Sequence, residues 1–309
     1  MVAVYLPVRF LTRSLVLVAL FALSAGCSPV QPVSVEVMRV PETPCTDNQA
    51  IIFCDGFESG TLGLWQDGVD SSRQKVTAVD SDVVSGRRSL EVVYPAGDDG
   101  GWMTRWFMPG HDHVFARIYV RFQPGWRCGG NCTKLIAFYA NRVDDRWSGF
   151  GKAGIRPTGQ DYFYAGLATS NWHRQPDPGE IIFYSYHPEM RQAKDGRFWG
   201  NFSYQDDPRD ALRPGRWYCV EFEVQANSPG QHDGYQNMWI DGMLRGRVSG
   251  MRWRDSPDVR INAFQLTFSG AVPVTERMWM DDVVVSTERV GCNRPLVNDT
   301  ADQAATAPR

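Results

Sequence analysis

The feature that most constrains this chain is a long succession of short, strand-like segments separated by turn-forming residues. In residues 115–122, Ala116, Ile118, Val120 and Phe122 alternate with arginine, tyrosine and phenylalanine, so the expected strand has one apolar face and one mixed face. Pro-Gly and Asp-Gly pairs recur between such segments, and these pairs supply the backbone conformations of tight turns. The pattern predicts antiparallel strands and excludes a helical bundle or a coiled coil.

The expected strands fill most of the region from residue 51 to residue 292, and no change in composition divides it. Strands with one apolar and one polar-aromatic face suit two packed sheets, so the expected fold class is all-β, an antiparallel β-sandwich of jelly-roll type. We expect one domain over residues 51–292, preceded by a proline-rich tether at 27–50 and followed by a loose tail at 293–309. The expected strands are residues 51–57, 74–79, 88–94, 101–107, 113–122, 133–140, 147–156, 160–168, 180–187, 216–226, 235–241, 259–268 and 277–286.

Residues 1–26 have the composition of an export signal of the lipoprotein type. Arg9 and Arg13 precede the apolar run 15–23, which is shorter than the roughly 20 residues that span a bilayer. The segment that ends in Cys27 resembles a bacterial lipobox, in which the cysteine is lipidated and becomes the first mature residue. An ordinary secretory signal is the alternative. We therefore expect an exported protein, either anchored to the outer membrane by a lipid or periplasmic or extracellular.

Cysteine usage fits an oxidising compartment. Lipidation of Cys27 leaves six cysteines, an even number that suits disulfides. Cys128 and Cys132 could close a small loop around two glycines; a zinc site is the alternative, but no second close pair stands at zinc-ligand spacing. The other pairings stay open, and a Cys54–Cys292 bridge would join the first strand to the last. The six disulfide candidates are Cys45, Cys54, Cys128, Cys132, Cys219 and Cys292.

Positive charge is concentrated in residues 101–160, although the whole chain has a formal net charge of −3. This region has nine Lys and Arg residues and only three acidic residues, which favours a basic face for an anionic ligand. The alternative is a solvated face whose acidic partners come from elsewhere in the fold. A pI near 6.0 argues against a nucleic-acid partner. Many aromatic residues accompany the arginines. Sugar rings stack on aromatic faces and guanidinium groups pair with carboxylates, so an acidic polysaccharide is the favoured partner.

Three short motifs resemble those of concanavalin A-like jelly rolls. Residues 53–60, followed by Trp65, are similar to the opening strand of that fold. Residues 237–242 are similar to its strand-turn-strand element, and residues 279–285 are similar to its closing strand. Binding proteins and enzymes share these motifs, so the resemblance implies the fold and leaves the function open.

The acidic residues give weak support for glycoside hydrolysis or calcium binding. Hydrolysis requires two carboxylates about 5–9.5 Å apart, and the jelly-roll hydrolases of family 16 carry them in a Glu-x-Asp-x-Glu string that this chain lacks. Glu221 and Glu223 share a strand face, but a structural or solvated pair is the favoured interpretation. We expect no cofactor and no catalytic metal. A structural Ca²⁺ is an option at the acidic residues of the sandwich ends, which are Asp55, Glu58, Asp281 and Asp282.

Basic and tyrosine residues resemble the active site of polysaccharide lyase family 14, a family of alginate and glucuronan lyase-like enzymes. Residues 129–135 resemble its Gly-Gly-Lys-Leu segment, which implies that Lys134 is catalytic. The resemblance also implies a basic catalytic residue at Lys152 and a catalytic pair at Tyr162 and Tyr164. The chain departs from the family where Asn-Cys-Thr interrupts the glycine–lysine segment, where lysine replaces an arginine, and where phenylalanine replaces a serine two residues earlier.

The chemistry of β-elimination explains the need for such residues. The uronate carboxylate must be neutralised, the C5 proton removed by a base, and the leaving O4 protonated. By alternation Lys134 shares a strand face with Ile136 and Phe138, and such apolar neighbours would lower its pKa, as a base requires. The remaining residues expected near this site as substrate ligands, including a second tyrosine pair that competes with the first, are Arg117, Tyr119, Arg121, Tyr184, Tyr186 and Gln265.

We therefore expect an exported or lipid-anchored monomer that cleaves a uronate-containing polysaccharide by β-elimination. A non-catalytic concanavalin A-like carbohydrate-binding protein is the alternative, because both would need basic and aromatic residues. Only the lyase needs a base and an acid that converge on one sugar.

Overall fold

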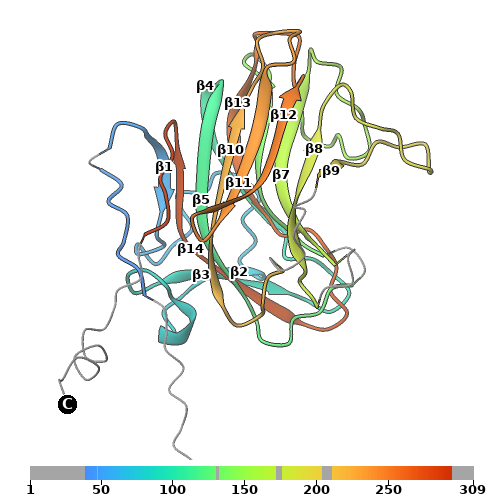
Figure 1. Cartoon of the computed structure of the whole chain (residues 1–309). Helices are drawn as coiled ribbons and strands as arrows, with labels where there is room; N and C mark the ends of the chain where they lie inside the picture. Colours follow the sequence, from blue (N-terminus) through green and yellow to red (C-terminus); the bar gives the residue numbers. More distant parts are fainter. Residues whose placement is uncertain (1–38, 47, 130–131, 172–175, 204–210, 294–309) are drawn as a thin grey trace, which may run out of the picture. The chain divides into compact units, whose positions relative to one another are not determined.

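Two antiparallel sheets form the domain in the computed structural model, which describes residues 39–46, 48–129, 132–171, 176–203 and 211–293 (Figure 1). The eight-stranded sheet has β1 (Ile51–Asp55) paired with β14, and its other strands run in the order β12 (Met243–Met251), β11 (Gly234–Ile240), β10 (Trp217–Gln225), β5 (His113–Phe122), β14 (Glu276–Ser286), β3 (Ser89–Tyr94) and β2 (Gln74–Thr77). The six-stranded sheet has the order β4 (Trp102–His111), β13 (Val259–Thr267), β6 (Lys134–Arg142), β7 (Tyr162–Ser170), β8 (Glu180–Tyr186) and β9 (Asn201–Ser203). This arrangement confirms the predicted β-sandwich.

The core lies between the inner faces of the two sheets. Phe138 of β6 stacks against Phe222 of β10 with ring centroids 5.9 Å apart, so the two sheets meet directly at this point. The alternation predicted for residues 115–122 holds, since Ile118, Val120 and Phe122 are fully buried in the main apolar cluster. Burial of such side chains stabilises the fold by roughly 1.5–3 kcal/mol each.

Most of the expected strands are present, with one error and two omissions. Residues 147–156 form a turn-rich loop and not the predicted strand, because Gly151 and Gly154 adopt positive φ angles of 70° and 79° that interrupt extended backbone. The strands β9 and β12 were not predicted. β12 lies at a sheet edge and exposes most of its side chains, so its sequence lacks apolar alternation. The Asp241-Gly242 turn before it was predicted, and both residues have positive φ as a tight hairpin requires.

A β-bulge in β6 changes the direction of one side chain. Lys134 is paired with Ala168 and Ile136 with Leu167, so the register shifts between Lys134 and Ile136. Ile136 and Phe138 enter the core, whereas Lys134 lies on the opposite, outer face of the sheet. The prediction that Lys134 shares a face with Ile136 and Phe138 is therefore wrong, because a bulge reverses the alternation on which it rested.

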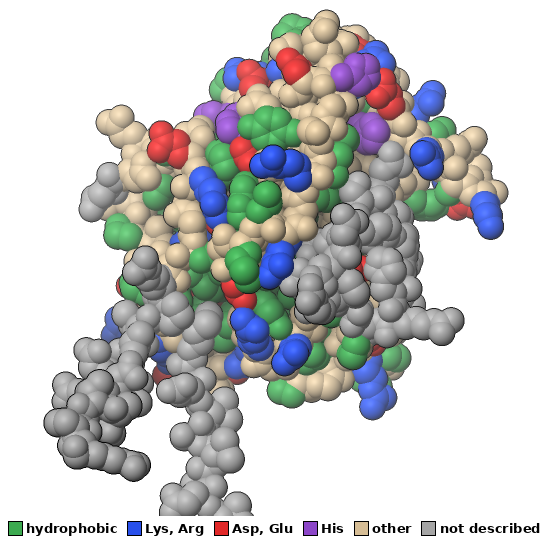
Figure 2. All heavy atoms as spheres, in the orientation of Figure 1, with side chains coloured by type: hydrophobic (Ala, Val, Ile, Leu, Met, Phe, Trp, Pro, Cys, Tyr) green, Lys and Arg blue, Asp and Glu red, His purple; other side chains and the backbone are tan. Residues whose placement is uncertain are grey.

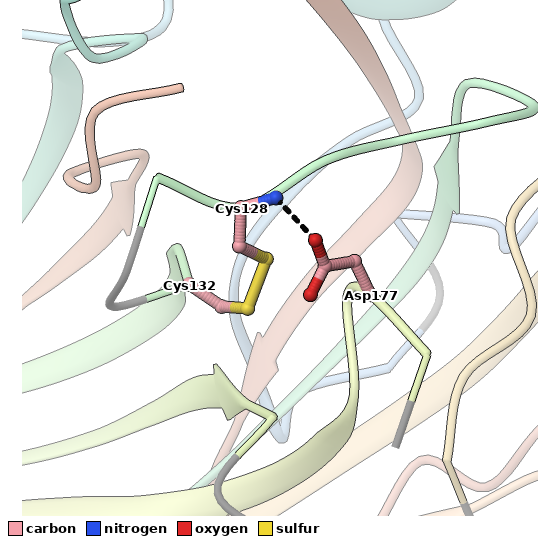
Figure 3. A group of neighbouring side chains, drawn as sticks. All are labelled: Cys128, Cys132 and Asp177. Atoms are coloured by element: carbon pink, nitrogen blue, oxygen red, sulfur yellow. Dashed lines mark hydrogen bonds between the residues drawn. A yellow bond between two sulfur atoms is a disulfide. The ribbon is translucent and has the colours of Figure 1, made fainter. Parts of the chain in front are cut away.

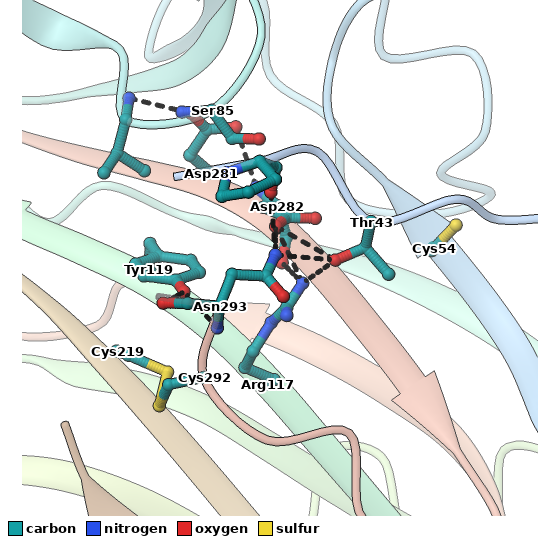
Figure 4. A network of polar contacts seen from close by, with 12 residues as sticks. Thr43, Cys54, Ser85, Arg117, Tyr119, Cys219, Asp281, Asp282, Cys292 and Asn293 are labelled. Atoms are coloured by element: carbon teal, nitrogen blue, oxygen red, sulfur yellow. Dashed lines mark hydrogen bonds and ion pairs between the residues drawn. A yellow bond between two sulfur atoms is a disulfide. The ribbon is translucent and has the colours of Figure 1, made fainter. Parts of the chain in front are cut away.

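The segments on either side of the expected domain also pack against it. Val40 is buried and forms a bridge with Ser85, so the domain begins before the predicted boundary at residue 51. Thr43 and Asn293 both hydrogen-bond to Asp282 of β14 through its Oδ2 atom, at 3.1 and 3.2 Å (Figure 4). The first and last described segments therefore meet at one buried carboxylate.

Three disulfides join the six cysteines of the domain. They connect Cys45 to Cys54, Cys128 to Cys132, and Cys219 to Cys292. The Cys128–Cys132 pairing was predicted, but the suggested Cys54–Cys292 bridge is wrong. After the last strand the chain reaches β10, and there the Cα of Cys292 lies 6.0 Å from that of Cys219. Cys27 lies outside the described residues.

The described part of the chain contains one short 3₁₀ helix, Asp80–Asp82, and no helix that is long and apolar enough to cross a membrane.

Candidate active site

The outer face of the six-stranded sheet carries a row of aromatic side chains. The pairing register places Trp106, Ala263, Tyr139, Tyr164 and Tyr186 side by side on β4, β13, β6, β7 and β8. Residues opposite each other on neighbouring antiparallel strands point to the same face, so these rings share one surface. Tyr139 and Tyr164 meet edge to face at 4.8 Å.

The next row on this face contains smaller residues. Gln265, Ala137, Gly166 and Tyr184 are neighbours on β13, β6, β7 and β8. Gly166 leaves room for the Tyr164 ring, because an added Cβ would lie 2.7 Å from a ring carbon. Gln265 was a predicted substrate ligand, and it does lie on the same face as the tyrosines.

Lys134 projects from the β6 bulge onto this surface. Its Nζ atom lies 4.6 Å from the ring centroid of Tyr184 and 5.7 Å from that of Tyr164. Burial lowers the pKa of Lys134 from 10.5 to about 8, and only the distant charge of Asp99 opposes this shift. With this pKa about a tenth of the Lys134 amine is uncharged at pH 7, far more than at an ordinary lysine, and the uncharged form is the one a general base requires.

The two tyrosine pairs lie together and do not compete. Tyr164 is the cross-strand partner of Tyr186, and the hydroxyls of Tyr184 and Tyr186 are 3.0 Å apart. Tyr162 lies on the same face of β7 as Tyr164 and donates a hydrogen bond of 2.5 Å to the carbonyl oxygen of Ile155. Burial raises the pKa of Tyr164 well above its ordinary value, so this phenol keeps its proton and can act as an acid.

Two adjoining cavities, here called the tyrosine groove, surround Lys134. One measures about 270 Å³ and extends from Lys134 to Cys132 and Trp199. The other measures about 120 Å³ and is lined by Lys134, Lys152 and the tyrosines. Lys134 and Tyr184 line both cavities, so they stand where the two meet. Lys152 comes from the loop over the sheet and not from the strand that was expected to carry it.

The structure brings together five of the tyrosines of this region, and one of them was not predicted as a site residue. Tyr139 stacks on Phe150 at 4.5 Å and lines the groove. Its position opposite Phe138 in the strand alternation was the signal that could have identified it. Trp199 also lines the groove, but nothing in its local sequence indicates that role.

Arg117, Tyr119 and Arg121 lie in the other sheet, so their predicted place beside Lys134 is wrong. Arg117 is fully buried and pairs with Asp282 at 2.8 Å (Figure 4). Arg121 pairs with Asp82 and lies 4.4 Å from the ring centroid of Trp279. Tyr119 exchanges hydrogen bonds with the backbone of Asn293. Each of these side chains supports the outer face of the eight-stranded sheet.

The remaining basic residues divide by their location. Arg142 pairs with Asp144 at 2.8 Å, an acidic residue of the same region and not one from elsewhere in the fold. Among the described residues, no carboxylate lies within ion-pair distance of the six other cations of this region, which are Arg105, Arg127, Lys134, Arg146, Lys152 and Arg156. Figure 2 shows Lys and Arg side chains interspersed with acidic and apolar ones, so positive charge forms no continuous patch on the face in view.

The acidic residues do not form a hydrolase site. Glu221 accepts hydrogen bonds from Arg289 at 2.6 Å and from the Gly291 N–H at 2.7 Å. Glu223 contacts His113 at 2.8 Å and accepts a bond from Asn237 at 2.6 Å, and these contacts together hold its pKa below the ordinary value against the opposing effect of burial. Both carboxylates are therefore engaged by protein groups at the eight-stranded sheet.

Two of the acidic residues considered for Ca²⁺ accept hydrogen bonds from protein groups. Asp55 accepts hydrogen bonds from the Phe57 N–H and the Trp65 indole, and Asp281 accepts bonds from backbone N–H groups. Among the described residues, one group of three side chains is close enough together to hold a metal ion: Cys128, Cys132 and Asp177. Figure 3 shows that its two cysteines form a disulfide and that Asp177 accepts a bond from the Cys128 N–H. These sulfurs are not available as thiolate ligands.

No protein-family model and no curated protein sequence matches this chain. Solved structures do. Alginate lyase Aly36B is 16% identical, with a TM-score of 0.57 over 84% of this chain and 99% of that chain. Alginate lyase vAL-1 from Chlorella virus is 18% identical, with a TM-score of 0.59 over 77% and 100% of the two chains.

An endo-β-1,4-glucuronan lyase from the fungus Trichoderma reesei is 17% identical, with a TM-score of 0.54 over 79% of this chain and 98% of that chain. The chain has the jelly-roll fold of these lyases. At identities this low the structural match establishes the fold alone, and it confirms the predicted architecture. Activity must be argued from the residues of the groove.

Proposed function

We propose that this protein is a polysaccharide lyase that cleaves a uronate-containing chain by β-elimination. The observation that carries the proposal is Lys134, an amine with a pKa lowered to about 8 beside the protonated phenol of Tyr164. A base whose pKa is lowered and an acid whose pKa is raised are the pair of groups that proton transfer at neutral pH requires.

Each proton in the reaction has an acceptor or a donor in the groove. The uncharged Lys134 amine removes the C5 proton, and the electron pair of the C5–H bond forms the C4–C5 double bond. The C4–O4 bond then breaks, and its electron pair remains on O4 and takes the phenolic proton of Tyr164. The reaction leaves an ammonium and a phenolate side by side, and transfer of one proton between them restores the starting state.

Charge on the uronate carboxylate must be neutralised before the C5 proton becomes acidic. Lys152 lines the same cavity as Tyr162 and Tyr164 and has no acidic partner among the described residues, so it suits this role. Tyr162, whose hydroxyl bonds to the Ile155 carbonyl, holds the wall of the cavity that carries Lys152. Gln265 and the Tyr184–Tyr186 pair contribute polar contacts to the sugar hydroxyls.

The comparisons support this class of substrate. Proteins with the same fold are described as alginate and glucuronan lyases, and variants of Aly36B have been solved in complex with an alginate trisaccharide and an alginate tetrasaccharide. Alginate and glucuronan are both chains of uronic acids. An acidic polysaccharide of this kind is accordingly the proposed substrate.

Incubation of the purified protein with alginate, glucuronan and glycosaminoglycans tests the proposal. β-Elimination creates a double bond conjugated to the carboxylate, so ultraviolet absorbance should rise with at least one polymer. The Lys134→Ala variant is the control and should give no rise. Binding without any rise in absorbance would favour the alternative, a carbohydrate-binding protein without catalysis.

We also infer that the protein is exported and that Cys27 anchors it through a lipid. The three disulfides support an oxidising compartment. A Cys27→Ser variant should then lose its membrane association or its processing. Unchanged fractionation and unchanged mass in that variant would contradict the anchor.

A further inference from the structure

We propose that the outer face of the six-stranded sheet carries a second sugar-binding element, which holds the polysaccharide away from the point of cleavage. This element, here called the tryptophan platform, consists of Trp102, Trp106, Arg146 and Trp147. The inference rests on the proposed lyase function and specifies its substrate further: a long polyuronate that is gripped several sugars from Lys134.

Exposed tryptophan is the first observation. Trp102 and Trp147 expose 37% and 42% of their surface, although large aromatic side chains are usually well buried. Trp147 meets Trp106 at 5.0 Å, and Phe150 contacts Trp102 at 6.3 Å and Trp147 at 5.1 Å. The rings therefore form one aromatic cluster whose exposed members are Trp102 and Trp147, and exposed indole faces of this kind are surfaces on which sugar rings stack; Trp106 is buried and supports them.

The second observation is the arginine of the platform. The guanidinium carbon of Arg146 lies 5.3 Å from the ring centroid of Trp106 and 5.1 Å from that of Trp147. Cation–π contacts of this kind hold the group in place without using its N–H donors. No acidic side chain of the described residues pairs with Arg146. Its planar fork is thus available for a carboxylate, which it can bind through two hydrogen bonds.

The platform and the tyrosine groove lie on the same face. Trp106, Ala263, Tyr139 and Tyr164 are successive cross-strand neighbours from β4 to β7. Three strand spacings separate Trp106 from Tyr164, which is about 14 Å. Phe150 links the two ends, because it stacks on Tyr139 at 4.5 Å and contacts Trp106 at 5.2 Å. A continuous surface therefore leads from the tryptophans to Lys134.

A polar pair lies between the two ends, in the row beside the aromatic one. Gln265 of β13 donates a hydrogen bond of 3.0 Å to the hydroxyl of Thr104, its neighbour on β4. Thr104 is fully buried, so Gln265 is the member of this pair that can reach a sugar hydroxyl, while the rings at either end provide stacking surface. A polyuronate fits this order of chemistry, since it offers a ring and a carboxylate in every sugar unit. A neutral polysaccharide could stack on the platform but would leave Arg146 without a partner.

Binding by the inactive Lys134→Ala variant tests the platform without cleavage. We would measure the dissociation constants of an alginate trisaccharide and an alginate octasaccharide by calorimetry, and repeat them with glucuronan fragments. A trisaccharide centred on the groove reaches only one sugar to each side, whereas an octasaccharide reaches the platform. Adding Trp147→Ala should weaken octasaccharide binding about tenfold, equivalent to about 1.4 kcal/mol. Trisaccharide binding should stay unchanged.

The arginine gives an independent readout. Arg146→Gln should also weaken octasaccharide binding, and the loss should shrink as salt is raised, because salt screens the attraction between charges. Trp147 and Arg146 are both exposed, so neither substitution should disturb the fold. Matched controls are Trp239→Ala and Arg216→Gln, an aromatic residue and an arginine at the eight-stranded sheet, which should change neither ligand's affinity.

The outcomes separate this proposal from the proposed function. Equal loss for both chain lengths, or no loss for the octasaccharide, would overturn the platform while cleavage by the native protein stands. Length-dependent binding with no cleavage of any polymer would support the platform and refute the lyase. Failure of every uronate chain to bind would overturn both.

Discussion

Replacing Lys134 with methionine should stabilise the folded protein at neutral pH while abolishing cleavage. Lowering the pKa of Lys134 from 10.5 to about 8 corresponds to a penalty of about 3 kcal/mol on the charged form in the folded state. Water in the groove screens part of this penalty, so we expect a gain of about 1–3 kcal/mol in the free energy of unfolding. Methionine is apolar and similar in length, and it leaves no buried charge behind.

The gain should depend on pH in a direction set by the lowered pKa. Below about pH 8 both the folded and the unfolded chain hold the proton, so the penalty is fully present. Between pH 8 and 10.5 the unfolded chain binds the proton more tightly than the folded one, so stability of the native protein rises with pH. The advantage of the Lys134→Met variant should accordingly fade over that window.

Urea unfolding at pH 6.5 and again above pH 10.5, followed by tryptophan fluorescence, measures both quantities. Lys194→Met is the matched control, since Lys194 is exposed and its replacement should alter stability little at either pH. A Lys134→Met variant that is less stable than the native protein at pH 6.5 would refute the reasoning. So would a stability difference of the same size at both pH values.

Three further predictions concern other parts of the molecule. Tyr164→Phe removes the proposed acid without removing the ring, so turnover measured by product absorbance should fall by about 10²–10⁴-fold with an unchanged circular dichroism spectrum. Arg117→Met leaves Asp282 buried without its partner and should lower the free energy of unfolding by about 3–5 kcal/mol. A raised KM with unchanged stability would instead indicate that Arg117 binds the substrate. Replacing both Cys219 and Cys292 with alanine should lower the free energy of unfolding, measured in urea, by about 2–5 kcal/mol. The protein of native sequence, unfolded without a reductant, should show no reactive thiols among its six domain cysteines.

Local sequence pattern predicted the strands better than it predicted their neighbours. Alternation in β5 correctly placed Arg117 and Arg121 on the face opposite Ile118 and Val120. It contained no information about which sheet β5 would join. That choice depends on pairing with β10 and β14, which lie about 100 residues or more away along the chain. Two correctly oriented arginines were consequently assigned to the wrong side of the sandwich.

The candidate site shows the reverse case, because Lys134 does line the tyrosine groove although the local argument about its strand face is wrong. Lys134 was expected beside Ile136 and Phe138 and is in fact separated from them by a bulge. Its desolvation comes from the tyrosines of β7 and β8, which no pattern within β6 could reveal. The loop at residues 147–156 was mistaken for a strand, although its Gly151 and Gly154 adopt positive φ angles, and its Phe150 stacks on Tyr139 of β6.

The two outer faces of the sandwich differ in whether their buried charges have partners of opposite charge within the protein. On the eight-stranded sheet, Arg117 pairs with Asp282 and Arg289 with Glu221, so buried charges there are compensated within the protein. On the six-stranded sheet, Lys134 is desolvated without an acidic partner among the described residues. Arg146 and Lys152 of the same face also have no acidic partner among the described residues, so their positive charge is available to a bound anion. The face that leaves its cations unpaired is therefore the face that should bind an anionic ligand, and a uronate chain supplies one carboxylate for each sugar.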